Sequence, residues 1–166
     1  MAMLKVDNLS VHYGVIQAVK DVSIEVNEGE VVTLIGANGA GKTSILRTIS
    51  GLVRPSAGKI EFLGQEIQKE PARKIVASGL SQVPEGRHVF PGLTVLENLE
   101  LGAFLRNDRE ENQKNLKKVF DRFPRLEERK IHAQHLAFIC PGGQRAPLSV
   151  HFHLRFAYGL LILPTK

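Results

Sequence analysis

The stretch that decides the fold is GANGAGKT at residues 36–43, which fits the pattern G-x-x-x-x-G-K-[ST] in full. Its glycines let backbone N–H groups converge on phosphate oxygens without interference from a Cβ atom. A helix that begins at Gly41 points its positive end at the same anion. Lys42 reaches the β- and γ-phosphates, and the Thr43 hydroxyl is a ligand for Mg²⁺. The pattern predicts a nucleoside triphosphate site, and an ordinary glycine-rich turn is the alternative.

The residues around this loop supply the context that the motif requires. Residues 30–35 (EVVTLI) are nearly all apolar and β-branched, which predicts a strand covered on both faces. Residues 42–50 carry apolar side chains at helical spacing, and Gly51 is a helix stop. A strand, a glycine-rich turn and a helix therefore follow one another.

Hydrophobic periodicity places further elements on both sides of the loop. Strands are predicted at residues 4–13, 18–26, 59–63 and 80–83, and helices at residues 72–77, from a capping box at residues 94–97, and along an apolar stripe at residues 116–123. Strands that alternate with helices after an opening pair of strands indicate an α/β domain with a small antiparallel addition.

Composition excludes several classes of protein. The 166 residues are 43% hydrophobic and 23% charged, which is typical of one globular domain and argues against disorder or a fibrous repeat. The longest apolar run, residues 159–163, is far shorter than the roughly 20 residues of a transmembrane helix. The N-terminus lacks the apolar core of a signal peptide, and Cys140 is the single cysteine. A cytoplasmic location is therefore expected.

The charge of the chain changes abruptly near Arg129. Residues 1–128 hold 17 basic and 17 acidic side chains, whereas residues 129–166 hold five basic side chains and no acidic one. This basic tail is interpreted as a solvated arm, as a contact for nucleic acid or membrane, or as sequence foreign to the domain that it follows. His151 and His153, two residues apart without a third partner, are not expected to hold a metal ion.

The rest of the motif content narrows the class of phosphate-loop protein. The chain lacks the N-K-x-D motif with which GTPases bind guanine, which argues against a GTPase. Small-molecule kinases usually begin with the strand before the phosphate loop, whereas here other strands come first. Residues 3–132 resemble the ATPase subunit of an ABC transporter. In particular, residues 4–14 (LKVDNLSVHYG) resemble the opening strand and adenine-stacking loop of that family. The resemblance implies that Tyr13 lies against the adenine ring, the alternative being a tyrosine packed on the core.

Residues 83–102 (VPEGRHVFPGLTVLENLELG) and 120–130 (FDRFPRLEERK) are similar to the branched-chain amino acid importers of the Liv type and to their relatives for amides and urea. Most ABC ATPases have a glutamine that contacts Mg²⁺ and the attacking water where this chain has Glu85. The resemblance thus implies that Glu85 is a catalytic residue and an Mg²⁺ ligand. A solvated loop glutamate is the alternative.

The resemblance breaks in the tail. The family continues with L-S-G-G-[EQ]-Q, but residues 140–145 are CPGGQR, and Pro141 has neither hydroxyl nor N–H. The apolar residues 160–163 stand where the Walker B strand belongs, and Pro164 and Thr165 replace its Asp and Glu. The acids that hold magnesium and polarise water are therefore missing from that place.

The resemblance implies an α/β P-loop NTPase of the ABC ATPase type, incomplete at its C-terminus. It comprises a parallel core sheet, N-terminal antiparallel strands and a partial helical subdomain. Residues 1–128 are expected to form the ATP-binding domain and residues 129–166 a divergent basic tail without the Walker B acids. The cofactors implied are ATP and Mg²⁺. The residues expected to bind them are Tyr13, Gly36, Asn38, Gly39, Ala40, Gly41, Lys42, Thr43 and Ser44, with Thr43 and Glu85 on the metal.

Three functions stay open on these grounds. The first is an importer ATPase subunit whose C-terminal third is truncated or altered. It would act with a second ATPase subunit, a membrane permease and, indirectly, a solute-binding protein, on the inner face of the membrane. The second is a regulatory nucleotide-binding partner that does not hydrolyse ATP. The third is a nucleic-acid-binding P-loop protein that uses the basic tail, but no interleaved aromatic and basic motif supports it, so nucleic acid is not an expected partner.

Overall fold

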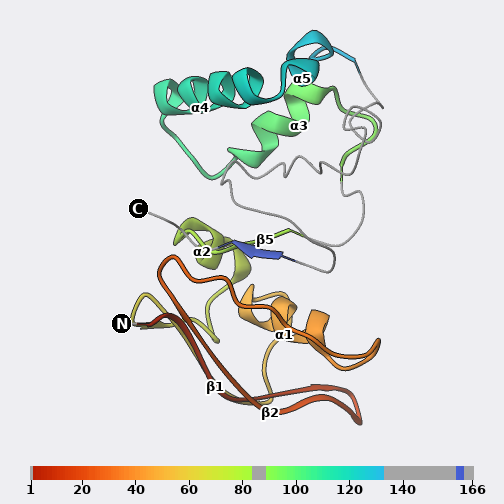
Figure 1. The fold of residues 1–166 in the computed structure, drawn as a ribbon, viewed down its shortest axis with the longest axis vertical. Coiled ribbons are helices and arrows are strands. Elements are labelled where there is room, and N and C mark those ends of the chain that lie inside the picture. Colours follow the sequence, from red (N-terminus) through yellow and green to blue (C-terminus); the bar gives the residue numbers. More distant parts are fainter. Residues whose placement is uncertain (1, 84–88, 133–159, 163–166) are drawn as a thin grey trace. The chain divides into compact units, whose positions relative to one another are not determined.

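The computed structural model describes residues 2–83, 89–132 and 160–162 (Figure 1). The chain divides into two compact units, Met1–Val83 with Phe156–Lys166, and Pro84–Arg155. The first unit contains β1 (Ala2–Tyr13), β2 (Ile16–Asn27), α1 (Lys42–Ile49), β3 (Ala57–Phe62), β4 (Gln65–Glu66), α2 (Ala72–Ala77), β5 (Ser81–Val83) and β6 (Leu160–Ile162). The second unit contains α3 (Val95–Gly102), α4 (Arg109–Arg122) and α5 (Pro124–Glu128).

An antiparallel sheet with the order β2-β1-β3-β4 organises the first unit. Its central strand, β1, buries Leu4, Val6, Leu9 and Val11, and fully burying one such side chain contributes about 1.5–3 kcal/mol. The buried positions change from even to odd numbers across Asn8, which has a positive φ of 48° at a register shift between β1 and β2. This bulge keeps all four side chains on one face and explains the imperfect alternation of the sequence.

The strands predicted at residues 4–13, 18–26 and 59–63 are thus confirmed as β1, β2 and β3. The helix predicted at residues 42–50 is α1, which buries Ile45, Leu46 and Ile49. Its end is set as expected by Gly51, whose φ is +75°. The N–H of Gly51 donates to the Thr48 carbonyl and that of Leu52 to the Arg47 carbonyl, which is the Schellman pattern.

The prediction of a strand at residues 30–35 is wrong. This stretch has no strand structure, and Val31 and Ile35 are 83% and 93% exposed. A strand covered on both faces requires a neighbouring ladder on each side. None of the described strands pairs with this stretch, so most of its apolar side chains are exposed, and Leu34 alone of them packs partly against the core.

The strand predicted at residues 80–83 is confirmed as β5, which pairs with β6 in a second sheet. The two strands run antiparallel, with Ser81 opposite Ile162 and Val83 opposite Leu160. Every ladder among the described residues is therefore antiparallel. The described strands do not form the parallel core sheet that the resemblance implies.

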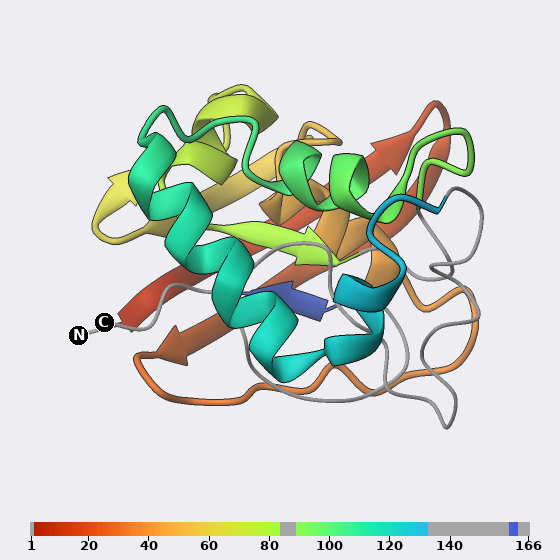
Figure 2. The ribbon, with the colours of Figure 1, turned by 90° about the horizontal axis from the view of Figure 1, so that it is seen from above.

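The second unit consists of helices in its described residues (Figure 2) and has its own apolar core. Val95 and Leu99 of α3 pack with Phe120 of α4 and Leu126 of α5. The predicted capping box is present, because the Thr94 hydroxyl accepts the Glu97 N–H and the Glu97 carboxylate accepts the Thr94 N–H. The predicted apolar stripe is also confirmed, since it faces this core from α4.

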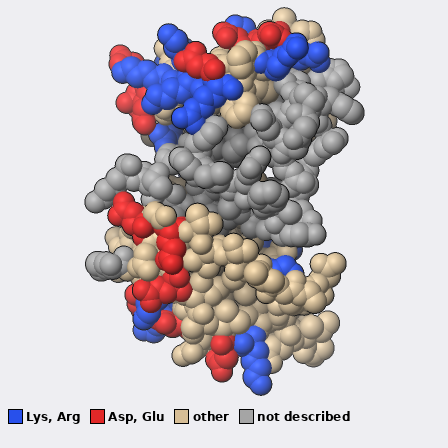
Figure 3. Space-filling view, viewed as in Figure 1, with Lys and Arg blue, Asp and Glu red and all other residues tan. Residues whose placement is uncertain are grey.

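The outer face of α4 carries charges of both signs. Its sequence, REENQKNLKKVFDR, alternates basic and acidic groups, and Figure 3 shows Lys and Arg beside Asp and Glu on this unit. Such a mixed surface is typical of a solvated helix face. None of the helices in the described part of the chain has the length and apolar character needed to cross a membrane.

Candidate nucleotide-binding site

The loop at residues 36–43 is shaped by two glycines in the left-handed region. Gly39 and Gly41 both have φ of +86°, which strains any residue with a Cβ. At Gly41 a Cβ would also lie 2.4 Å from the carbonyl oxygen of Ala18 in β2. Glycine at this position thus lets the start of α1 pack directly against the β1–β2 hairpin (Figure 1).

The Lys42 side chain folds back over the loop. Its ammonium donates hydrogen bonds of 2.7 Å to the carbonyl oxygens of both Gly36 and Ala37. The loop therefore surrounds a positive charge, and the two carbonyls hold that charge beside the start of the helix. Phosphate oxygens are stronger acceptors for an ammonium than neutral carbonyls are, so an entering phosphate competes well for this side chain.

The first turn of α1 presents backbone donors at the same place. The Ile45 N–H donates to the Gly41 carbonyl at 2.9 Å, so the amides that precede it have no partner within the helix. No acidic residue lies in this first turn, and no side chain caps it. The positive end of the helix is therefore left to attract an anion. Thr43 is exposed here and Ser44 is half-buried.

Tyr13 lies beside the first turn of α1. It ends β1, and its hydroxyl is 3.4 Å from the Ser44 Oγ. The side chain is 43% exposed, so it does not pack in the core as the alternative interpretation required. Its ring is available to a flat ligand next to the phosphate loop.

The remaining loop residues are open to solvent. Gly36, Asn38, Gly39 and Ala40 are exposed, and the Ala40 N–H donates to the Ala37 carbonyl at 3.1 Å. The structure thus brings all nine predicted nucleotide-binding residues into one region of the first unit. Their contacts with a ligand stay a prediction.

Several predicted positions lie outside the described residues. They are Glu85, Pro141, His151, His153, Pro164 and Thr165. In the described residues, no group of three or more His, Cys, Asp and Glu side chains could hold a metal ion. Mg²⁺ often binds through few protein oxygens together with phosphate oxygens of the substrate. The exposed Thr43 hydroxyl fits that mode of binding.

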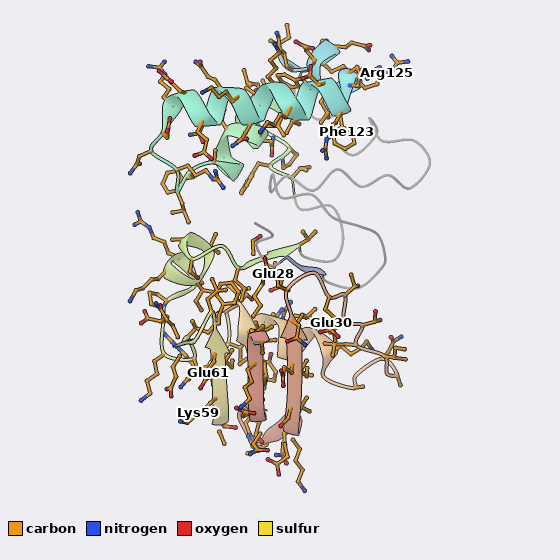
Figure 4. All side chains as sticks on the ribbon, turned by 60° about the vertical axis from the view of Figure 1, so that its left-hand side comes forward. Glu28, Glu30, Lys59, Glu61, Phe123 and Arg125 are labelled. Atoms are coloured by element: carbon orange, nitrogen blue, oxygen red, sulfur yellow. The ribbon has the colours of Figure 1, made fainter. Side chains whose placement is uncertain are left out.

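Glu30, the acidic residue closest in sequence before the phosphate loop, contacts the turn that follows β2. Figure 4 shows Glu28 and Glu30 beyond the end of β2. The Glu30 carboxylate accepts the N–H of Asn27 at 2.9 Å and its side-chain amide at 3.2 Å. Glu30 thus has a structural contact outside the phosphate loop.

Sequence reasoning missed two polar contacts. Buried Asn98 in α3 hydrogen-bonds both backbone groups of Phe90 and the carbonyls of Leu93 and Thr94, so it holds the segment before α3 in place. Ser50, at the C-terminal end of α1, contacts Gln82 in β5. Both contacts join residues whose pairing no local pattern reveals. The one sign of these contacts in the sequence was the presence of an asparagine or a serine within an apolar stripe.

Comparison with known proteins places this geometry in a family. Residues 19–163 match the family model described as ABC transporter, so the match includes most of the basic tail. The chain is 43% identical over 161 residues to the high-affinity branched-chain amino acid transport ATP-binding protein BraG of Pseudomonas aeruginosa. That alignment covers 97% of this chain and 67% of BraG.

Two further matches agree. BraF of the same organism, also a high-affinity branched-chain amino acid transport ATP-binding protein, is 37% identical over 58% of this chain and 38% of its own length. The solved structure of an ATP-binding subunit of an ABC transporter has a TM-score of 0.71 and 29% identity, over 88% of this chain and 59% of its own. The chain thus spans at most about two thirds of these relatives. It belongs to the ABC transporter family and carries the family's ATP-binding domain, with the P-loop NTPase fold.

Proposed function

We propose that the chain acts as the ATP-binding subunit of an ABC importer for branched-chain amino acids. The observation that carries this proposal is the phosphate loop itself, in which Lys42 lies between the carbonyls of Gly36 and Ala37 at the uncapped N-terminus of α1. The 43% identity to BraG, over nearly the whole chain, supports the choice of transporter.

Different groups of the chain would bind the different parts of Mg-ATP. Backbone amides of the loop and of the first turn of α1 bind the phosphates, and Lys42 exchanges its two carbonyl partners for phosphate oxygens. Tyr13 stacks on the adenine ring. Mg²⁺, when bound, neutralises charge on the β- and γ-phosphates. Thr43 would hold it, and Glu85 would offer a second oxygen.

We propose in addition that this chain hydrolyses ATP slowly. In an α/β sheet the groups that act on a ligand lie at the carboxyl ends of parallel strands. Here β6 runs antiparallel to β5, so its C-terminal end lies beside Ser81 and away from Val83. Pro164 and Thr165 also offer no carboxylate where the family has two. A nucleotide-binding regulatory partner is therefore the second candidate function.

The same proposal defines the partners and the location. We expect a second ATPase subunit, identical or different, because the family's nucleotide sites form between two such subunits. A membrane permease would dock on the ATPase pair, and a solute-binding protein would act through the permease. The chain would then lie in the cytoplasm, on the inner face of the membrane. Within the chain, residues 1–128 would supply the ATP-binding domain and residues 129–166 the divergent tail.

The choice of transported substrate has a direct test. The chain is expressed with the permease pair of a branched-chain amino acid importer and, separately, with that of a urea or amide importer. We expect co-purification in the presence of Mg-ATP with the first pair and not with the second. Assembly with the urea or amide permeases alone would assign the chain to those importers. Assembly with neither would contradict a role as a transporter subunit.

A further inference from the structure

One side-chain hydrogen bond ties the C-terminal end of α1 to β5. Ser50 is 4% exposed, and its Oγ lies 2.7 Å from Gln82 Oε1. Two backbone carbonyls are also within reach, those of Leu46 at 2.9 Å and Arg47 at 3.2 Å. Both already accept backbone N–H bonds, from Ser50 and Leu52. The hydroxyl has one proton and three acceptors within reach, of which Gln82 Oε1 is the nearest.

This bond connects the helix of the phosphate loop with the strand that precedes the second unit. α1 begins at Lys42 in the phosphate loop and ends next to Ser50. β5 is the last element before the chain passes, at Pro84, into the second unit. The bond therefore joins the helix of the phosphate site to the strand that leads out of the first unit. In the described part of the chain, no other side-chain hydrogen bond reaches β5.

We propose that Gln82 is a positioning residue that, through Ser50, couples occupancy of the phosphate loop to the order of β5. This inference rests on the proposed binding of ATP at that loop. A bound nucleotide holds the N-terminus of α1, and the helix transmits this restraint to its other end because it is a short rigid element. β5 has only three residues and a short ladder to β6, and the part-buried Ser50–Gln82 bond adds a side-chain link to them.

Thermodynamic linkage makes the coupling measurable from both sides. If ATP strengthens the hold on β5, then loss of the Ser50–Gln82 bond must weaken ATP binding by the same factor. The net contribution of a single hydrogen bond sets the scale of this loss in affinity at about three- to tenfold. Two variants that break the same bond should also be non-additive, because the second change has nothing left to remove.

The experiment measures ATP affinity by calorimetry, and hydrogen exchange of residues 81–83 with and without Mg-ATP. The proteins are the wild type, Ser50→Ala, Gln82→Met and the double variant. We expect ATP to slow exchange of β5 in the wild type and to do so much less in all three variants. Affinity should fall about three- to tenfold in each, with no further loss in the double variant.

Two variants separate this coupling from a merely structural role. Ser78, at the C-terminal end of α2, is exposed and donates to the Ile75 carbonyl at 2.7 Å, so Ser78→Ala removes a hydroxyl from another helix end and should change neither measurement. Ser50→Thr keeps the hydroxyl and should restore both. If Ser50→Ala does not fold, Gln82→Met carries the test, because Met has a similar volume at a half-buried position.

The outcomes distinguish this inference from the proposed function. A wild type without ATP affinity would overturn both. A wild type that binds ATP, with Gln82→Met and Ser50→Ala binding equally well and showing the same ATP-dependent protection of β5, would overturn the coupling alone. Fully additive losses in the double variant would also overturn it, since the two side chains would then act separately.

Discussion

The hydroxyl of Tyr13 lies 3.4 Å from the Oγ of Ser44, which brings the end of β1 to the first turn of α1. A contact of this length is weak, so the hydroxyl contributes little to the position of the ring. The aromatic ring itself, 43% exposed beside the phosphate loop, is the part of Tyr13 that an adenine base would meet.

Replacing Tyr13 by Ala should therefore weaken ATP binding about two- to tenfold, because aromatic stacking contributes about 0.5–1.5 kcal/mol. Tyr13→Phe and Tyr13→Trp should bind ATP as the wild type does, since both retain a ring. Titration calorimetry on the three variants compares them directly. If all three variants bind ATP with the wild-type affinity, Tyr13 does not contact the base.

Gly41 should tolerate a side chain less well than Gly39 does. Both have φ of +86°, so an Ala at either position is strained by about 1–2 kcal/mol. At Gly41 the new Cβ would also meet the Ala18 carbonyl at 2.4 Å, whereas nothing lies within 4 Å at Gly39. Urea denaturation of Gly41→Ala and Gly39→Ala measures the difference. Equal stability of the two variants would contradict the close packing of the loop against β2.

The helical unit should lose stability in acid through Glu97. The N–H and hydroxyl of Thr94 hold the pKa of the Glu97 carboxyl below its ordinary value. A lowered pKa means that the stabilisation is present above the ordinary pKa of glutamate and is lost as the pH falls through the lowered one. The free energy of unfolding of the wild type should thus decrease as the pH is lowered from about 5 to about 3.

Glu97→Gln provides the comparison, because Gln retains the capping geometry and does not titrate. Its urea midpoint should depend less on pH over that range. Glu100→Gln, which changes an exposed glutamate of the same helix outside the capping box, should keep the wild-type dependence. The same acid sensitivity in Glu97→Gln as in the wild type would show that the capping box does not titrate as described.

The elements that the sequence predicted best are those set by neighbours in the chain. The capping box of Thr94 and Glu97 and the stop at Gly51 require only residues within a few positions, and both are present. The prediction of a strand at residues 30–35 was wrong because the apolar pattern indicates only that the stretch is suited to burial. Whether it is buried depends on strands elsewhere in the chain. Ser50 and Gln82 were missed for the same reason, since 32 positions separate them.

Hydrolysis should be slow compared with ordinary enzymes. Loss of one group that stabilises the transition state commonly lowers the rate by about 10²–10³. The resemblance to the family implies that Pro141, Pro164 and Thr165 stand at three positions of functional side chains. Phosphate release is measured on the purified chain alone and with a complementary ATPase subunit and permease pair. Turnover near 1 s⁻¹ that Lys42→Ala abolishes would show that another residue does the work of the missing glutamate.

Binding of ATP at the phosphate loop is the claim on which the rest depends, and titration calorimetry of Mg-ATP with the wild type, Lys42→Ala and Lys59→Ala tests it most directly. Lys42 has its ammonium in the loop, whereas Lys59 pairs with Glu66 on the sheet at 3.2 Å and serves as the matched loss of one charge. We predict that Lys42→Ala binds ATP at least tenfold more weakly, because it removes a charged hydrogen-bond donor from the phosphates. Lys59→Ala should bind as the wild type does. Equal affinity in the wild type and Lys42→Ala would contradict the account.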